Sequence, residues 1–275
     1  MAYKRILTIQ DISCVGQCSM TVALPILSAC GHETCVLPTV LLSTHTGGFG
    51  KPAVVHFDHA LEEIWKHWKD NAITFDAILV GYLGSVAAVK TAERIIDQLL
   101  APEGVAIVDP AMADHGKLYS GFDETYADAV AVLCRKADIL LPNITEAAML
   151  SGMPYREQLC EMYVEQLLQG LEHKCVVLTG VGYEPDKTGV MVRAGTELWH
   201  YCHPRTEKSY HGTGDIFAAA FTGALMWGRS IRDASRIAAE FTCKCINETT
   251  ANPAHWYGVK FEPALPELIQ MLNNS

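Results

Sequence analysis

The stretch HGTGDIFAAAFTGALMW, residues 211–227, does most to decide the fold. Residues 216–227 are apolar on every face, which predicts a helix buried between other elements. Before it, Gly212 and Gly214 flank Thr213 and let the backbone approach a ligand, and the amides and dipole of the helix start attract an anion. Asp215 then stands where it can accept the proton of an attacking hydroxyl. The turn predicts phosphoryl transfer; the alternative is a glycine turn that Asp215 merely caps.

Short β-rich runs alternate with helical stretches over the rest of the chain. The runs span residues 5–9, 34–38, 77–80, 105–108, 139–141 and 175–179, and helical periodicity is clearest at 86–100, 123–136, 156–171 and 229–247. This alternation predicts a mainly parallel sheet with helices on both faces, an α/β/α sandwich. Residues 189–193 and 197–201 predict a hairpin that extends the sheet at one edge.

Composition predicts one compact unit that spans residues 1–275. With 49% hydrophobic and 19% charged residues the chain can bury a large core, and no repeat, low-complexity tract or linker marks a domain boundary. The net charge of -10 provides no basic field for nucleic acid or an anionic membrane. The longest apolar run, residues 216–227, is shorter than the roughly 20 residues of a membrane-spanning helix. Without a secretory signal, we expect a cytoplasmic protein with reduced thiols.

The ten cysteines and the other glycines match no further ligand pattern. Cysteine spacing does not match paired CxxC zinc motifs, so we interpret the thiols as small buried hydrophobes. No GxxxxGK[ST] loop occurs, and the turn after the first predicted strand lacks the three spaced glycines of a dinucleotide fingerprint. Both common nucleotide-binding motifs are therefore absent from the sequence.

Acidic side chains follow two of the predicted strands. Asp109 and Asp114 come after the buried run 105–108, and Asn143 and Glu146 follow the next strand. In open parallel sheets, ligands bind at the carboxyl ends of the strands. Magnesium needs only a few carboxylates together with waters and phosphates, so these residues predict a metal site. The alternative is a turn aspartate and a helix capping box.

Taken in order, these segments resemble the ribokinase-like superfamily and, within it, the pyridoxal kinase family. The resemblance rests on residues 7–10 with Gly16, 43–47, 81–82, 109–114, 142–146 and 212–215. It implies a ribokinase-like three-layer α/β/α sandwich. The implied reaction is attack of the 5'-hydroxymethyl group of pyridoxal, pyridoxine or pyridoxamine on the γ-phosphate of ATP. Asp215 would be the base, and Gly212 and Gly214, with Thr213 between them, would form the anion hole.

The resemblance also assigns binding roles by position. Substrate contacts are implied for Asp11, Val40, Leu42, His45, Thr46, Tyr82 and His211. ATP contacts are implied for Asp109, Asn143, Thr179, Gly180 and Lys208, and metal contacts for Asp109, Asp114 and Glu146. Mg²⁺ with ATP, a monovalent cation (K⁺ or Na⁺) as an option, and a homodimer are further implications of the family.

Three positions depart from the family pattern. Asp11 stands where a neutral hydroxyl is common, and it could pair with a protonated ring nitrogen or amine and so favour pyridoxamine. Ala113 stands where similar loops carry glycine. His211 replaces an apolar residue before the glycine turn, so either it contacts the substrate or it is a solvent-facing loop residue. Tyr82 and His45 likewise have alternatives, as a core tyrosine and as a turn-capping histidine.

Other functions remain open at this stage. The same turn would serve a hydroxymethylpyrimidine kinase, although residues 46–47 and 81–82 favour pyridoxal. A sugar or nucleoside kinase would carry more polar residues near the N-terminus. A non-catalytic ligand-binding homologue is disfavoured by the intact turn at 212–215. Residues 113–120 and 182–187 are the two segments that we expect to close over ATP.

Overall fold

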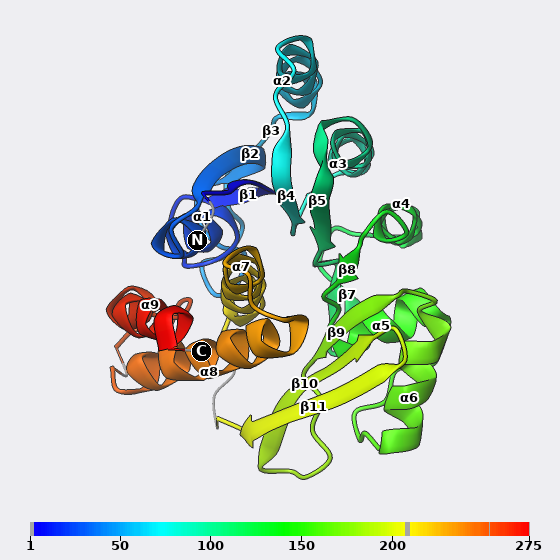
Figure 1. Cartoon of the computed structure of the whole chain (residues 1–275), viewed down its shortest axis with the longest axis vertical. Coiled ribbons are helices and arrows are strands. Elements are labelled where there is room, and N and C mark those ends of the chain that lie inside the picture. Colours follow the sequence, from blue (N-terminus) through cyan, green and yellow to red (C-terminus); the bar gives the residue numbers. More distant parts are fainter. Residues whose placement is uncertain (1–2, 207–209, 253, 275) are drawn as a thin grey trace.

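The computed structural model describes residues 3–206, 210–252 and 254–274 of the 275-residue chain (Figure 1). Its main feature is a nine-stranded sheet in the order β11-β10-β9-β8-β5-β4-β1-β2-β3. The strands are β1 (Arg5–Ser13), β2 (Glu33–Leu42), β3 (Val54–His56), β4 (Phe75–Val80), β5 (Leu100–Val108), β8 (Ile139–Leu140), β9 (Cys175–Thr179), β10 (Lys187–Ala194) and β11 (Glu197–Pro204). Every predicted strand is present.

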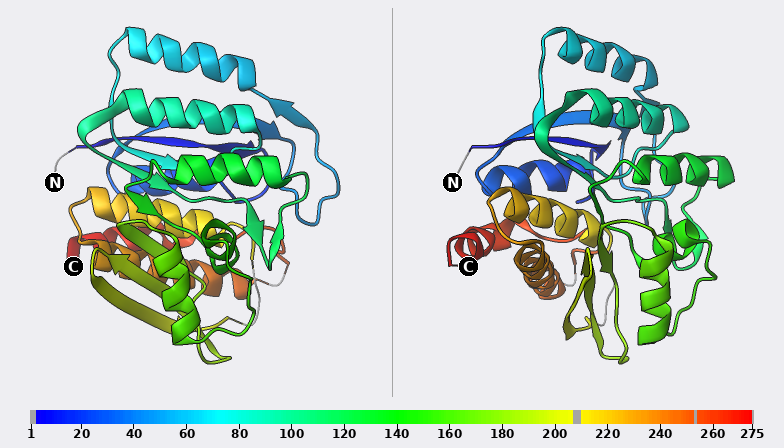
Figure 2. Two further views of the ribbon diagram at one scale, coloured as in Figure 1. Left: turned by 90° about the vertical axis from the view of Figure 1, so that its right-hand side faces the viewer. Right: turned by 45° about the vertical axis from the view of Figure 1, so that its right-hand side comes forward.

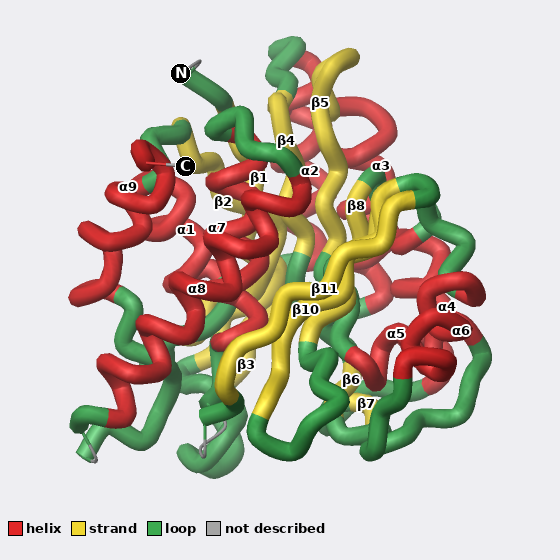
Figure 3. The backbone as a smooth tube through the Cα atoms, turned by 60° about the horizontal axis from the view of Figure 1, so that its bottom comes forward, coloured by secondary structure: helices red, strands yellow, loops and turns green. Residues whose placement is uncertain are grey.

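The centre of the sheet is parallel and its two edges are antiparallel. Parallel pairing joins β2, β1, β4, β5, β8 and β9. At one edge β10 pairs antiparallel with both β9 and β11, which confirms the predicted hairpin (Figure 3). The short strand β3 pairs antiparallel with β2 at the other edge. A separate two-stranded hairpin, β6 (Ala113–Asp114) with β7 (Lys117–Leu118), follows β5.

Helices cover both faces of the sheet (Figure 2). They are α1 (Met20–Ala29), α2 (Asp58–Asp70), α3 (Val86–Leu99), α4 (Glu124–Cys134), α5 (Ile144–Ser151), α6 (Glu161–Gly170), α7 (Thr213–Met226), α8 (Ile231–Thr250) and α9 (Leu265–Asn274), with a 3₁₀ turn η1 (Glu262–Ala264) before the last. One core layer contains buried residues of α2 to α6, and the other contains those of α1 and α7 to α9. This three-layer arrangement confirms the predicted fold class.

Strand residues alternate between these two layers because successive side chains of a strand point to opposite faces. In β1, Ile6 lies in the layer of α7, whereas Leu7 and Ile9 lie in the layer of α3. In β4, Ala77 and Leu79 alternate with Ile78 and Val80 in the same way. Such strands, buried on both faces, are typical of the centre of a parallel sheet.

Helix α7 is the buried helix that its composition predicts. Its residues from Ile216 to Ala224 are all buried, between α1 on one side and α8 on the other. Gly223 allows α7 to pack closely against the end of α1, because a Cβ on it would lie 2.4 Å from the sulfur of Cys30, the residue that follows α1. The position of the first turn of α7 is therefore fixed by packing along its whole length. Within the described residues, no helix is long and apolar enough to cross a membrane.

The ten cysteines are all free thiols. Five of them are buried, namely Cys18, Cys30, Cys134, Cys175 and Cys245. These five fit the interpretation as small hydrophobic side chains, and burial raises the pKa of Cys175 to about 11. Cys14, Cys160 and Cys202 are exposed and do not fit it.

Candidate active site

The predicted turn lies at the start of α7, where Gly212 has a φ of +85°. A Cβ at this position would lie 2.1 Å from the carbonyl oxygen of Gln17, so only glycine fits. The amide of Ile216 donates to the carbonyl of Gly212 at 3.0 Å and makes the first helical hydrogen bond. Among the described residues, the amides of positions 213–215 have no backbone or side-chain acceptor. They are the free donors that an anion at a helix start would use.

Asp215 lies in the first turn of α7, with its carboxylate close to Asp11 of β1. Enclosure by protein raises the pKa of Asp215 to about 7, and repulsion from Asp109 and Asp11 adds to this effect. A hydrogen bond from the backbone N–H of Ser19 acts in the opposite direction. A carboxylate with a pKa near neutrality is matched to the work of a general base at physiological pH.

Asp11, on β1, is a buried carboxyl group of the same site. Its backbone N–H donates to the carbonyl of Tyr82 at 3.1 Å, and the hydroxyl of Ser13 donates to its carboxylate at 3.2 Å. Burial raises the pKa of Asp11, while the hydroxyls of Ser19 and Ser13 lower it. The structure therefore places a second acidic group, on β1, within electrostatic reach of the predicted base.

Asp109 follows β5 and faces the same turn. Its Oδ2 lies 4.0 Å from the place that a Cβ on Gly214 would occupy. Its Oδ1 accepts the N–H of Ala111 at 3.2 Å, which holds the carboxylate in a tight turn. Burial, reinforced by the charge of Glu146, raises the pKa of Asp109 well above its usual range. Strand β5 and helix α7 thus bring Asp109 and Asp215 to one place.

Asn143 and Glu146 form a complete capping box at the start of α5. Asn143 Oδ1 accepts the N–H of Glu146 at 3.0 Å, and Glu146 Oε2 accepts the N–H of Asn143 at 2.9 Å. Glu146 is buried, and its Oε1 also accepts the N–H of Met112 at 3.0 Å. Asn143 Nδ2 donates to the carbonyl of Ala113 at 2.8 Å. The capping alternative for these two residues is therefore realised, and both side chains support the strand ends.

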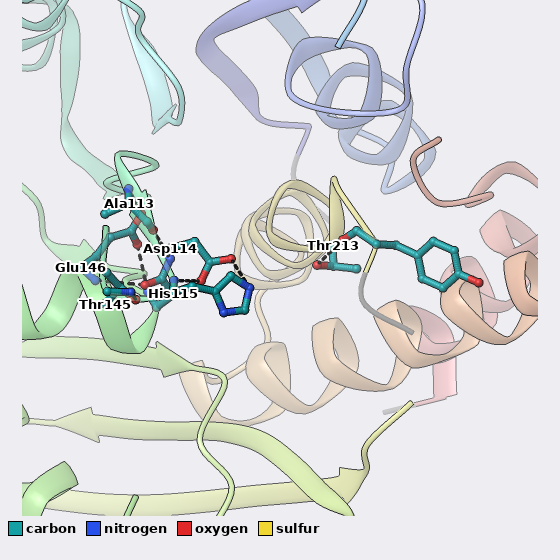
Figure 4. A network of polar contacts seen from close by, with 9 residues as sticks. Ala113, Asp114, His115, Thr145, Glu146 and Thr213 are labelled. Carbon is teal, nitrogen blue, oxygen red and sulfur yellow. Dashed lines mark hydrogen bonds and ion pairs between the residues drawn. The ribbon is translucent and has the colours of Figure 1, made fainter. Parts of the chain in front are cut away.

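The β6–β7 hairpin carries Asp114 at an exposed position. Its carboxylate contacts His115 of the hairpin tip, at 2.8 Å from the backbone N and 3.5 Å from Nε2. Figure 4 shows this pair beside Glu146 and Thr145, with Thr213 at the start of α7 on the facing side. Asp109 therefore lies near Asp215, whereas the contacts of Asp114 are with its own hairpin.

The acceptor side of the site is formed by β2 and the segment after β4. Val40 is buried, and its Cγ1 lies 3.0 Å from the position of a Cβ on Gly84; Tyr82 Cε1 lies 3.4 Å from the same point. The ring of Tyr82 stacks on Phe122 with centroids 5.2 Å apart. Burial, with the charge of Asp11, raises the pKa of Tyr82 to about 12, so its hydroxyl stays protonated. Leu42 is also buried, at the end of β2.

The loop after β2 brings two histidines together. The rings of His45 and His211 lie 4.4 Å apart, and Gly47 N donates to His45 Nδ1 at 3.0 Å. A Cβ on Gly47 would lie 2.6 Å from His211 Nε2, so this glycine makes room for both rings. Burial, and then repulsion from His211, lowers the pKa of His45. Thr46, between them, is exposed.

Thr179 ends β9 beside Asn143, and Gly180 follows it. The N–H of Thr179 donates to the carbonyl of Pro142 at 2.9 Å, and Gly180 has a φ of +78°. Lys208, to which the resemblance assigns a phosphate contact, lies outside the described residues. A hollow of about 530 Å³ beside His173 and Lys174 lies at the other ends of the strands, away from all these side chains.

Four neighbours of the site have no role in the motif-based prediction. Tyr119 lies within electrostatic reach of Asp109, Asp114, Glu146 and Asp215, and burial with these charges raises its pKa. The other three are Gln17, Ser19 and Trp256. The polar segment 113–120 indicates Tyr119 weakly, since we expected it to close over ATP. Nothing in the sequence near Trp256 indicates its contact with Gly48, which lies two hundred positions away.

The site carries an excess of negative charge. None of the ion pairs within the described part of the chain involves Asp11, Asp109, Glu146 or Asp215. Uncompensated carboxylates that lie close together favour a bound cation. The described part of the chain contains no group of three or more His, Cys, Asp or Glu side chains that could hold a metal ion. A cation here would need ligands from a bound phosphate and water as well as from protein.

Comparison with known proteins decides which family has this site. A family model described as phosphomethylpyrimidine kinase matches residues 27–259, which is most of the chain. The chain belongs to this kinase family. A solved pyridoxal kinase from Lactobacillus plantarum is 33% identical, with a TM-score of 0.90 and 98% of both chains covered.

Two further members of the family are similar over nearly the whole chain. A Bacteroides thetaiotaomicron protein, provisionally named a phosphomethylpyrimidine kinase and solved with pyridoxal, is 32% identical with a TM-score of 0.92; the match covers 97% of this chain and 96% of that one. A pyridoxine/pyridoxal/pyridoxamine kinase from Bordetella avium is 28% identical over 97% of this chain and 93% of its own. The resemblance inferred from the motifs, to the pyridoxal kinases of the ribokinase-like fold, is confirmed.

Proposed function

We propose that this protein transfers the γ-phosphoryl group of ATP to the 5'-hydroxymethyl group of pyridoxal, pyridoxine or pyridoxamine, and so produces pyridoxal 5'-phosphate or its vitamers. One observation carries the proposal: Asp215, with a pKa near neutrality, lies at a helix start whose amides at 213–215 are free and which faces Asp109. The pyridoxal kinases among the relatives share the family and the fold.

The acceptor ring would lie between β2 and the segment after β4. Val40 and Leu42 provide apolar walls, and Tyr82 provides a flat ring with a protonated hydroxyl. His45, Thr46 and His211 would border the ring on the side of the loop after β2. Asp11, at the bottom, would face a polar or charged group of the acceptor, because a buried carboxylate is stable only beside a partner.

In the transfer step, the carboxylate of Asp215 would take the proton of the hydroxymethyl group as its oxygen bonds to the γ-phosphorus. The bond from that phosphorus to the bridging oxygen breaks, and ADP leaves with the bonding electrons. Gly212 and Gly214 would hold the migrating group against the amides of the turn, which include that of Thr213. Because the transition state is loose, these positioned donors would contribute more than the base does.

The ATP side would be formed by the ends of β5, β8 and β9. Asp109 fits an Mg²⁺ ion because its carboxylate has no cationic partner in the described residues, and Glu146 and Asn143 would support the site from the capping box. The bound ion would neutralise charge on the phosphates. Asp114 would reach it only through water. Thr179 and Gly180 would border the nucleotide, and a K⁺ or Na⁺ ion is a further option.

Hydroxymethylpyrimidine is the second candidate acceptor, because the matching family model carries the name of a phosphomethylpyrimidine kinase. The same Asp215 chemistry would act on its hydroxymethyl group. The match of residues 46–47 and 81–82 to the pyridoxal kinases favours pyridoxal. A non-catalytic binding protein would not need a carboxylate base such as Asp215 beside the unpaired amides of a helix start, so it is the weakest alternative.

An acceptor comparison tests this proposal. Purified protein with MgATP is given pyridoxal, pyridoxine, pyridoxamine or hydroxymethylpyrimidine, and ADP release is followed beside an Asp215→Ala control. We expect turnover of at least one pyridine acceptor by the wild type and almost none by the variant. Equal inactivity of both on all four compounds would exclude the kinase reaction, and binding without turnover would favour a non-catalytic homologue.

Three further properties belong to the same proposal. We infer one kinase domain over residues 1–275, a homodimer, and a location in the cytoplasm, all by similarity to the family rather than from a contact of this chain. Light scattering on the purified protein would test the dimer, with an expected mass about twice the 30.1 kDa of the chain.

A further inference from the structure

The loop between β1 and α1, residues 14–19, contacts the proposed site at three points. The carbonyl of Val15 accepts the N–H of His45 at 2.8 Å. The carbonyl oxygen of Gln17 faces Gly212, at 2.1 Å from the place of a Cβ there. The backbone N–H of Ser19 lies close enough to the carboxylate of Asp215 to lower its pKa. Both ends of the turn 212–215 therefore rest on this one loop.

The side chain of Gln17 joins the loop to the C-terminal segment, residues 255–262. Its Nε2 donates to Glu262 Oε1 at 2.6 Å, and its Oε1 lies 2.9 Å from His255 Nε2. A carboxylate only accepts hydrogen bonds, so the amide nitrogen must face Glu262 and the amide oxygen must face His255. His255 Nε2 therefore carries a hydrogen. The orientation of the amide is fixed by both of its partners.

The backbone of Gln17 packs closely against two glycines. Gly258 has a φ of +68°, and a Cβ on it would lie 2.7 Å from Gln17 Cβ and 2.8 Å from Gln17 N. Gly212 leaves no room for a Cβ beside the carbonyl oxygen of the same residue. Gln17 therefore contacts both the C-terminal segment and the turn 212–215 without space for a side chain at either glycine.

The same C-terminal segment covers the loop that carries His45. A Cβ on Gly48 would lie 2.5 Å from Trp256 Cζ3, and the rings of Phe49 and Trp256 are 4.6 Å apart. Phe49 also contacts Tyr257, at 5.4 Å between ring centroids. Residues 255–258 thus touch the acceptor loop through aromatic side chains and touch the turn through Gln17.

We propose that Gln17 is a positioning residue for phosphoryl transfer, which aligns the turn 212–215 by anchoring residues 255–262 with its side chain and packing its carbonyl against Gly212. This inference rests on the proposed kinase function. It extends that function to a residue that touches neither acceptor nor nucleotide in the proposed arrangement. A displacement of about 1 Å in such a turn is enough to weaken transfer, because the donors must meet the migrating group in the right geometry.

Replacing the donor of the Gln17–Glu262 hydrogen bond by an acceptor tests the proposal. Gln17→Glu places two carboxylates where the amide now donates to Glu262, so we expect kcat to fall about tenfold or more with the KM for pyridoxal changed less than about twofold. Adding Glu262→Gln in the same chain restores a donor opposite the new carboxylate, which can also accept from His255. The double variant is expected to recover most of the lost kcat.

Two single variants keep the test decisive if Gln17→Glu does not fold. Glu262 is exposed, so Glu262→Ala should fold, and we expect it to lower kcat several-fold because the anchor is lost. Glu267→Ala, in the helix α9 that follows this segment, is the matched control: Glu267 pairs with Lys244 at 3.0 Å, and the variant should keep wild-type kcat. Melting temperatures separate a loss of stability from a loss of kcat in folded protein.

The outcomes separate the two proposals. Wild-type kcat in both Gln17→Glu and Glu262→Ala, or a double variant no better than Gln17→Glu, would overturn the role of Gln17 and leave the kinase function intact. A wild-type chain that phosphorylates none of the acceptors would instead overturn the proposed function, and the role of Gln17 with it.

Discussion

At the scale of single residues, the charge of Asp215 sets the pH dependence. The base must be ionised, so kcat should fall as pH drops below about 7, where this carboxyl takes up its proton. Stability should change in the opposite direction. Since the folded pKa exceeds the unfolded one, the carboxyl adds stability below the ordinary value of 3.8, and this stability is lost as pH rises through about 7.

Asp215→Asn removes this titration and is expected to be more stable than the wild type at pH 8, although it has lost activity. The melting temperatures of both proteins, measured from pH 5 to pH 8, should diverge as pH rises. Asp70→Asn, at the exposed end of α2, serves as the control and should show no such divergence. A constant difference between Asp215→Asn and wild type would contradict the proposed enclosure of the carboxylate.

Gly212→Ala should damage the turn more than the same change at a roomy glycine. Both Gly212 and Gly228 have positive φ, but a Cβ on Gly212 meets the carbonyl of Gln17, whereas one on Gly228 has nothing within 4 Å. We expect Gly228→Ala to cost about 1 kcal/mol of unfolding free energy from backbone strain, and Gly212→Ala about 2–3 kcal/mol together with most of the activity. Urea unfolding compares the two, and equal losses would show that the close contact does not matter.

Asp11→Ser tests the origin of acceptor preference. If the buried carboxylate pairs with a cationic amine, the variant should lose kcat/KM for pyridoxamine about tenfold more than for pyridoxine. Steady-state kinetics on both acceptors measures this ratio. An unchanged ratio would mean that Asp11 does not set the preference.

The motifs were sufficient to predict that Asp11, Asp109 and Asp215 belong to one site, because Asp11 and Asp109 lie near the carboxyl ends of β1 and β5 and Asp215 lies in the first turn of the helix that the glycine turn predicts. They were not sufficient for Gln17 or Tyr119. Their roles depend on contacts between segments far apart in sequence, such as Gln17 with Glu262, and no local pattern contains such contacts.

At the scale of elements, the capping box of α5 is expected to hold the β6–β7 hairpin as well as the helix. Glu146→Ala would leave the buried amide of Met112 and the partly buried amide of Asn143 without acceptors, which should cost about 3 kcal/mol of unfolding free energy. Asp123→Ala, at the exposed start of α4, removes one cap only and should cost about 1 kcal/mol. Chemical denaturation distinguishes them, and similar losses would contradict the double role of Glu146.

Elements with strong apolar or β-rich runs were predictable, and weaker ones were not. The central strands and α3, α4, α7 and α8 follow their sequence patterns closely. Helix α1 carries Pro25 in its interior, which argues against a helix on local grounds, yet packing on β1 and α7 maintains it. Strand β3 is short and exposed, so no apolar alternation marks it.

At the scale of the whole molecule, strand order was beyond prediction, because the place of β1 between β4 and β2 depends on long-range packing of both helix layers. That order brings Asp11 and Asp109 to one edge of the sheet, beside Asp215 of α7. Because the site joins residues from several elements, we expect a bound ligand to stabilise the entire fold. Pyridoxal at about a hundred times its Kd should add about 2.7 kcal/mol of unfolding free energy. Thermal unfolding with and without pyridoxal measures this, and the absence of any shift would argue against an acceptor site.

Direct identification of the product tests the kinase activity and the role of Asp215 together. Wild-type protein and Asp215→Asn are incubated with MgATP and pyridoxal, and the formation of pyridoxal 5'-phosphate is followed by mass spectrometry. We expect the wild type to form it and the folded variant to lose kcat by about a hundredfold or more, while thermal unfolding still shows pyridoxal binding. A wild type that forms no phosphorylated product, or an Asp215→Asn variant that forms it at the wild-type rate, would contradict phosphoryl transfer at this turn.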